Sequence, residues 1–248
     1  MNTKTAAIIL AAGKGKRMNS DLPKVLHEVN GKPLVQMLLE NLAPVGLDRT
    51  IVVIGHKGEL VQEALKDMPV EFVWQHEQKG TGHAVQMAEK ALNGFDGTVL
   101  VATGDAPFLR AETVKNLFAI HEKNKAAATC LSAEFDDPTG YGRIIRKDDT
   151  DILLEIVEHN DASDEIRKIR EINSGTFCFD SRQMFKALRE VGDDNAQNEF
   201  YLTDTIKIIQ SWNLTCAVVK ADDPLEAVGI NSVRQLDEAE TEYSKRKL

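Results

Sequence analysis

Short apolar runs alternate with amphipathic stretches along the first half of the chain. The apolar runs have the length and composition of buried strands, and they are Ala6 to Leu10, Thr50 to Ile54, Val70 to Trp74 and Thr98 to Thr103. The stretches between them repeat apolar positions at helical spacing, and they are Pro33 to Leu42, Gly58 to Leu65, Thr81 to Leu92 and Thr113 to Asn124. Strand–helix alternation predicts parallel strands with right-handed crossovers, so we expect a Rossmann-like, doubly wound α/β sheet.

Two of these predicted helices carry start signals. Pro33 is expected at the first helical position, and Thr81 is expected to cap the third helix. In a sheet of this kind the ligand lies beyond the carboxyl ends of the strands, where loops meet helix N-termini.

The pattern changes after residue 125. Strands without obligatory helices between them are predicted at residues 127–135, 143–146, 152–159 and 172–179. We expect them to form a mixed sheet with a small antiparallel extension packed on the first strands. Helices are then predicted at 181–191 and 203–211, a strand at 215–219 and a charged helix at 232–247. We therefore predict one domain over residues 1–231, followed by a C-terminal helix over residues 232–248.

Composition narrows the classes of partner. The 248 residues include 30 Lys and Arg against 39 Asp and Glu, a net charge of −9, which argues against an electrostatically driven nucleic-acid binder. No apolar run approaches the roughly 20 residues of a membrane-spanning helix. The cysteines Cys130, Cys178 and Cys216 are far apart and lie in apolar runs, as reduced core thiols do. We expect a cytoplasmic protein.

A glycine-rich loop follows the first predicted strand. It reads Leu10-Ala11-Ala12-Gly13-Lys14-Gly15-Lys16-Arg17-Met18, with Pro23-Lys24 downstream. Glycines in this position let backbone N–H groups approach a phosphate, and Arg and Lys bind its oxygens. The dinucleotide fingerprint would need a third glycine where Met18 stands, and the P-loop motif is absent. The alternative interpretation of the loop is a solvated glycine-rich turn.

Two further positions suit a phosphorylated ligand. Asp105 directly follows a predicted strand, where a hard oxygen ligand would suit Mg²⁺ bridging phosphates. The alternative is a cap for a helix beginning near Leu109. Thr81 stands between Gly80 and Gly82 at a predicted helix start, where a ligand could rest on free N–H groups; the alternative there is plain capping.

Several motifs carry a family resemblance. The loop L-A-A-G-x-G-x-R-M with P-K downstream resembles the signature loop of sugar-nucleotide pyrophosphorylases. Residues 75–84, Q-H-E-Q-K-G-T-G-H-A, resemble a segment of the bacterial N-acetylglucosamine-1-phosphate uridyltransferases. The stretches 136–144, 156–159, 171–175, 195–204 and 229–231 follow in the order of that family.

The resemblance implies a role for each matching residue. The residues implied to hold the uridine nucleotide are Leu10, Ala11, Ala12, Gly13, Gln75, Gly80, Thr81 and Gly104. Those implied to act on the phosphates during catalysis are Arg17, Lys24 and Asp105. Those implied to hold the sugar are Gly142, Glu158, Asn173 and Asn231. Asp105 and Asn231 are also the implied ligands of a Mg²⁺ cofactor.

The implied reaction is transfer of UMP from UTP to N-acetylglucosamine 1-phosphate, by Mg²⁺-dependent in-line attack on the α-phosphate. Another sugar, such as glucose 1-phosphate, or another nucleotide is the first alternative, and Thr103 stands where the family usually has an aromatic residue. Glycosyl transfer from a UDP-sugar would normally require a D-x-D pair, whereas this chain reads Asp105-Ala106-Pro107. A non-catalytic UDP-sugar-binding module is the remaining alternative.

The resemblance also bears on partners and assembly. Bifunctional members of the family carry a C-terminal β-helix acetyltransferase, and this sequence ends at Leu248. We therefore expect neither acetyltransferase activity nor the trimer that the β-helix forms, but a monomer or weak oligomer. The expected partners are UTP and a sugar 1-phosphate, with no nucleic acid and no membrane.

Overall fold

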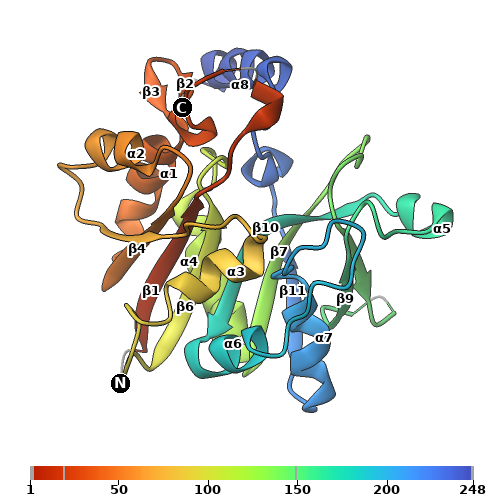
Figure 1. The fold of residues 1–248 in the computed structure, drawn as a ribbon. Coiled ribbons are helices and arrows are strands. Elements are labelled where there is room, and N and C mark those ends of the chain that lie inside the picture. The colour runs from red at the N-terminus through yellow and green to blue at the C-terminus, as the bar shows by residue number, and fades with distance from the viewer. Residues whose placement is uncertain (1–2, 19, 149, 247–248) are drawn as a thin grey trace.

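The computed structural model describes residues 3–18, 20–148 and 150–246, and its centre is a nine-stranded mixed sheet (Figure 1). The strands run in the order β11-β7-β10-β6-β1-β4-β5, with β8 paired to β10 and β9 paired to β8. Their bounds are β1 (Lys4–Ala11), β4 (Arg49–Ile54), β5 (Glu71–Trp74), β6 (Gly97–Thr103), β7 (Ala128–Glu134), β8 (Arg143–Arg146), β9 (Leu153–Val157), β10 (Glu171–Asp180) and β11 (Cys216–Lys220). A separate hairpin joins β2 (Glu28–Val29) to β3 (Lys32–Pro33).

Helices cover both faces of the sheet. The helices α1 (Leu34–Leu42), α2 (Gly58–Ala64) and α4 (Ala111–Lys123) pack on one face, and α3 (Thr81–Met87), α6 (Ser181–Leu188) and α7 (Asp204–Ser211) pack on the other. Neighbouring strand residues alternate between the two cores: Ile8 belongs to one cluster and Ile9 to the next. The doubly wound α/β fold is thus confirmed, and the three cysteines are buried and unbridged, as predicted.

One prediction about the second half of the chain is wrong. The strands β7 and β10, predicted as part of an extension packed on the first sheet, instead continue that sheet edge to edge, and β11 joins them. Strand β10 lies antiparallel to both β6 and β7, and β11 lies parallel to β7. Because β7 and the second half of β10 are largely buried, their backbone groups need hydrogen-bonding partners, which neighbouring strands of the main sheet supply. The small antiparallel extension is limited to β8 and β9.

Several element boundaries differ from the predicted ones. Helix α3 ends at Met87, earlier than predicted, and its N-cap residue is Gly80. Thr81 is therefore the first helical residue rather than the cap, and its hydroxyl accepts a hydrogen bond from the N–H of Leu202 at 3.1 Å. Pro33 is the N-cap residue of α1. The short helix α5 (Asp164–Arg167) and the β2–β3 hairpin were too short for the hydrophobic pattern to predict.

The last helix packs against the N-terminal part of the chain. Helix α8 (Val233–Arg246) lies beside the β2–β3 hairpin (Figure 1). The predicted C-terminal residues 247 and 248 lie outside the described residues. The α8 residues Leu236, Ala239 and Tyr243 join a small core that includes Phe108 and Ile230. Among the described helices none is both long and apolar enough to cross a membrane.

Candidate functional site

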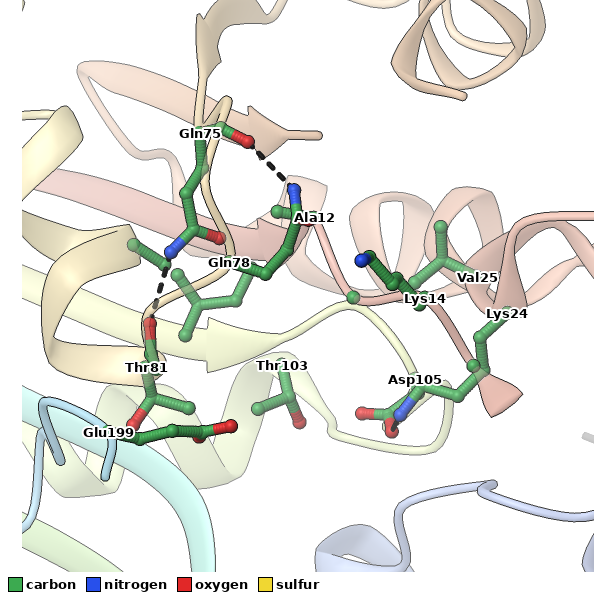
Figure 2. A pocket seen from close by; sticks show the side chains of 15 residues that line it. Ala12, Lys14, Lys24, Val25, Gln75, Gln78, Thr81, Thr103, Asp105 and Glu199 are labelled. Carbon is green, nitrogen blue, oxygen red and sulfur yellow. Dashed lines mark hydrogen bonds and ion pairs between the residues drawn. The ribbon is translucent and has the colours of Figure 1, made fainter. Parts of the chain in front are cut away.

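A cavity of about 480 Å³ opens where the parallel strands β1, β5 and β6 end (Figure 2). Segments far apart in the sequence meet there because their strands are neighbours in one sheet and end at the same edge. Figure 2 shows Lys24 and Asp105 at one end of the cavity and Gln75, Gln78 and Thr81 at the other, with Thr103 between them. The lining residues are Leu10, Ala12, Gly13, Lys14, Gly15, Lys24, Val25, Gln75, Gln78, Gly80, Thr81, Ala84, Thr103, Asp105 and Glu199.

The glycine-rich loop folds back on itself beside Lys24. Gly15 has a φ of +58°, and a Cβ atom there would lie 2.7 Å from the Cβ of Lys24. The N–H of Met18 donates to the carbonyl of Gly15 at 2.9 Å, which closes the turn. A glycine at position 15 therefore lets the loop approach Lys24 closely enough for Lys14 and Lys24 to line one cavity.

Four predicted residues form one polar cluster beside that loop, and Arg17 comes from the loop itself. The ammonium of Lys24 contacts the Asp105 carboxylate and donates to Asn231 Oδ1 at 2.9 Å. Arg17 Nη2 donates to the same oxygen at 3.0 Å. The N–H of Ile230 donates to the Asp105 carbonyl at 2.9 Å, which ties the segment before Asn231 to the end of β6. The structure therefore brings together Arg17 and Lys24 from the N-terminal part of the chain, Asp105 from the end of β6 and Asn231 from the segment before the last helix.

Asp105 is buried and does not cap a helix. The N-cap residue of α4 is Arg110, so the capping interpretation of Asp105 is wrong. Asp105 and Asn231 instead direct oxygen atoms at one cation, the ammonium of Lys24.

The converging oxygens of Asp105 and Asn231 fit a divalent cation, because Mg²⁺ takes one or two protein oxygens and completes its coordination shell with phosphate and water. The described residues contain no group of three or more His, Cys, Asp or Glu side chains that could hold a metal ion alone. Phosphate oxygens and water would therefore have to supply the remaining ligands.

The opposite end of the cavity is built around a buried glutamine. Gln75 is 3% exposed, and its Nε2 donates to the Gly80 carbonyl at 3.1 Å and lies 3.0 Å from His83 Nδ1. The main-chain carbonyl of Gln75 accepts from Gln78 Nε2 at 3.0 Å. Burial lowers the pKa of His83, which favours the neutral ring beside Gln75. The side-chain amide of Gln75 is thus held through its Nε2 by Gly80 and His83, and its main chain is held by Gln78.

Gly80 allows a close backbone approach at this end. Its φ is +109°, and a Cβ atom there would lie 2.6 Å from the carbonyl oxygen of Phe200 and 2.8 Å from its nitrogen. Phe200 donates its N–H to Lys79 and accepts from the N–H of Gly82, each at 2.8 Å. This double contact fixes the segment that carries Glu199 into the cavity.

The predicted sugar-binding residues Gly142, Glu158 and Asn173 form a second group. The N–H of Asn173 donates to the Gly142 carbonyl at 2.9 Å, and a Cβ atom on Gly142 would lie 3.3 Å from Glu158 Oε2. Glu158 accepts a hydrogen bond from the Thr203 hydroxyl at 3.0 Å, and burial raises the pKa of its carboxyl. None of the three lines the cavity itself.

The strand that carries Asn173 also approaches the cavity, at Thr103 on β6. A Cβ atom on Gly175, two residues after Asn173, would lie 3.2 Å from Thr103 Cγ2, and Thr103 lines the cavity. Strand β10 shifts register against β7 between Asn173 and Phe177, and Gly175 lies within this irregularity.

The remaining predicted residues lie beside the cavity rather than in its lining. The side chain of Ala11 belongs to the core, and the N–H of Gly104 donates to the Leu10 carbonyl at 2.9 Å. Sequence reasoning assigned nothing to Gln78, His83 and Glu199. The motifs at residues 75–84 and 195–204 contained these residues, but only the fold shows which of them reach the cavity.

The fold and the site together define an α/β domain with a charged cavity at the carboxyl edge of its sheet. Residues 7–202 match the family described as the MobA-like NTP transferase domain, and the chain belongs to that family. The predicted nucleotidyltransferase family is thereby confirmed.

Curated relatives extend the match along nearly the whole chain. The chain is 47% identical over 240 residues to the bifunctional protein GlmU of Streptococcus mutans, an alignment that covers 97% of this chain and 52% of the relative. It is 46% identical over 240 residues, with the same coverage, to GlmU of Halalkalibacterium halodurans. The chain thus spans about half the length of these relatives.

A solved structure shares the fold. The structure of a UDP-glucose pyrophosphorylase complexed with UDP-glucose superposes with a TM-score of 0.77 at 20% sequence identity, covering 98% of this chain and 99% of that one. At this identity the likeness shows a common fold.

Proposed function

We propose that this chain transfers UMP from UTP to N-acetylglucosamine 1-phosphate, releasing pyrophosphate. The observation that supports the proposal is the cluster of Arg17, Lys24, Asp105 and Asn231. Lys24 and Asp105 of this cluster line one end of a cavity whose other end is built around Gln75. The choice of uracil and of an N-acetyl sugar rests on the motif resemblance around residues 75–84 and 171–175, and on the likeness to GlmU.

The reaction needs no side chain as nucleophile or base. A phosphate oxygen of the sugar phosphate, already ionised near neutral pH, attacks the α-phosphorus of UTP. The bond from that phosphorus to the bridging oxygen breaks, and pyrophosphate leaves with the electron pair. Catalysis then consists of positioning and charge neutralisation.

The residues of the cluster divide this work between them. In the proposed complex, Arg17 and Lys24 neutralise charge on the α-phosphate and on the leaving group. Asp105 and Asn231 would hold Mg²⁺, which supplies charge neutralisation to the phosphates when bound. Gln75 and Gly80 would hold the uracil, whereas Gly142, Glu158 and Asn173 would hold the sugar.

Pyrophosphate release tests the proposal. Purified protein is assayed with Mg²⁺, UTP and N-acetylglucosamine 1-phosphate, and in parallel with glucose 1-phosphate and with dTTP. Turnover with the first pair alone is the expected result. Turnover with a different pair would keep the chemistry and refute the substrate assignment. Release of UDP from a UDP-sugar with an acceptor, without release of pyrophosphate from UTP, would indicate glycosyl transfer instead.

Variants test the roles within the cluster. Arg17→Ala and Asp105→Ala are each expected to lower turnover by about 10²–10³-fold, the usual effect of removing one preorganised contact to the transition state. Arg182→Ala is the matched control, because Arg182 is exposed and pairs with Asp96 at the surface. Near-full activity in either cluster variant would refute the assigned roles.

A further inference from the structure

The first turn of α8 reaches back to the polar cluster. Ser232 precedes the helix and Gln235 is its third residue, the S-x-x-Q spacing of a capping box. The N–H of Gln235 donates to the Ser232 hydroxyl at 3.3 Å, as that motif requires. The side chain of Gln235 departs from the usual arrangement: its Oε1 accepts from the N–H of Asn231 at 2.8 Å, one residue before the cap.

Asn231 is held from both sides as a result. Its backbone is fixed by Gln235, and its side chain donates from Nδ2 to the Gly229 carbonyl at 3.0 Å. Asn231 Oδ1 accepts the hydrogen bonds from Arg17 and Lys24. With Nδ2 and the backbone N–H both engaged, Oδ1 is the group of Asn231 that faces the cations.

Helix α8 also supports the Asp105 side of the cluster. The ring of Tyr243 packs on Phe108, three residues after Asp105, with ring centroids 6.5 Å apart. Phe108 and Ala239 belong to the same small core as Ile230, which donates its N–H to the Asp105 carbonyl. The helix therefore contacts the chain next to both oxygen donors while lining no part of the cavity.

We propose that Gln235 is a positioning residue that couples α8 to the divalent-cation site, and this inference rests on the proposed function. Gln235 contacts neither Lys24 nor Asp105; it acts by placing Asn231 so that its Oδ1 converges with the Asp105 carboxylate. Replacing a residue that hydrogen-bonds to a metal ligand typically lowers metal affinity by about 10–100-fold. The strength of cation binding in this domain thus depends on the helix that follows it.

The test compares Gln235→Met, which keeps the length of the side chain and removes the acceptor, with Gln235→Glu, which keeps the acceptor. Glu240→Gln, on an exposed position of the same helix, is the matched control. Binding of Mn²⁺ in the presence of UTP is titrated by electron paramagnetic resonance, and thermal unfolding is recorded for each protein. We expect Gln235→Met to weaken Mn²⁺ binding about 10-fold, and both Gln235→Glu and Glu240→Gln to retain it.

The remaining outcomes are distinct. A lower melting temperature in Gln235→Met with unchanged Mn²⁺ affinity would overturn the inference and leave Gln235 a helix cap only. Equal loss in Gln235→Glu would also overturn it, since that variant keeps the acceptor. If the wild-type protein binds no Mn²⁺ with UTP, the proposed function fails and the inference fails with it. If the wild-type protein binds Mn²⁺ with UTP and Gln235→Met binds it equally well, the inference is overturned and the proposed function is unaffected.

Discussion

Gly80 gives the most direct test of how the cavity is built. Replacing it with alanine places a Cβ atom 2.6 Å from the Phe200 carbonyl oxygen and 2.8 Å from its nitrogen, both backbone atoms. Neither can move away as a flexible side chain would, because Phe200 is hydrogen-bonded to Lys79 and Gly82. Alanine must also adopt the φ of +109° and ψ of 174° that Gly80 has as the N-cap residue of α3.

The magnitude follows from two contributions. A non-glycine residue held in that region of φ and ψ costs about 1–3 kcal/mol. Forcing an extra carbon into a packed site costs about 1–3 kcal/mol more. The free energy of unfolding of Gly80→Ala should therefore fall by roughly 2–6 kcal/mol. Because the Gly80 carbonyl also accepts from Gln75, its displacement should raise the KM for UTP by about 10-fold, the worth of one misplaced hydrogen bond.

Gly94 supplies the matched control for this substitution. It also has a positive φ, +74°, but a Cβ atom there would meet nothing within 4 Å. Gly94→Ala should thus show only the left-handed backbone cost, about 1–2 kcal/mol, with an unchanged KM for UTP. Urea unfolding and steady-state kinetics measure both quantities. Equal destabilisation by the two variants, with UTP affinity intact in each, would refute the role of the Phe200 contact.

Two further substitutions test the charged groups of the site. Lys24→Met should strengthen Mn²⁺ binding in the absence of nucleotide, because the Lys24 ammonium contacts both the Asp105 and the Asn231 oxygens. Turnover of the same variant should fall by about 10²–10³-fold. Unchanged Mn²⁺ affinity in an electron paramagnetic resonance titration would show that Lys24 does not compete with the metal. Burial raises the pKa of Glu158, so its ionised form destabilises the folded protein at pH values above the ordinary carboxyl pKa, and this cost disappears as the pH falls through the raised pKa. Glu158→Gln should therefore raise the melting temperature at pH 8, by about 2–4 °C for each kcal/mol relieved, with a smaller gain at pH 5 and a higher KM for the sugar phosphate. A melting temperature equal to that of the wild type at both pH values would contradict this account.

Much of the fold could be predicted from the hydrophobic pattern because most elements are long and strongly periodic. The strands β1, β4, β5 and β6 begin and end within one or two residues of the predicted bounds. The pattern could not assign β10 its place between β6 and β7, because strand pairing joins residues far apart in the chain. Short elements such as α5 lie below the length at which periodicity is informative.

The candidate site divides in the same way. Local chemistry identified the glycine-rich loop, Asp105 and the glycines around Thr81. Nothing local predicts that Thr81 bonds Leu202 rather than capping its own helix, since that partner comes from a segment about 120 residues away. Gln235 was missed although its capping-box spacing is visible in the sequence, because the spacing alone points to a helix start and not to Asn231.

By itself, the sequence determined the α/β class, the loop after the first strand and the order of the motifs, since these depend on periodicity and on residues adjacent in the chain. Only the tertiary structure decided that Arg17, Lys24, Asp105 and Asn231 share one cluster, and that Gln75 and Glu199 line one cavity. The physical reason is that the carboxyl ends of β1, β5 and β6 meet at one edge of the sheet. Strand order, which no local pattern encodes, converts separated residues into neighbours.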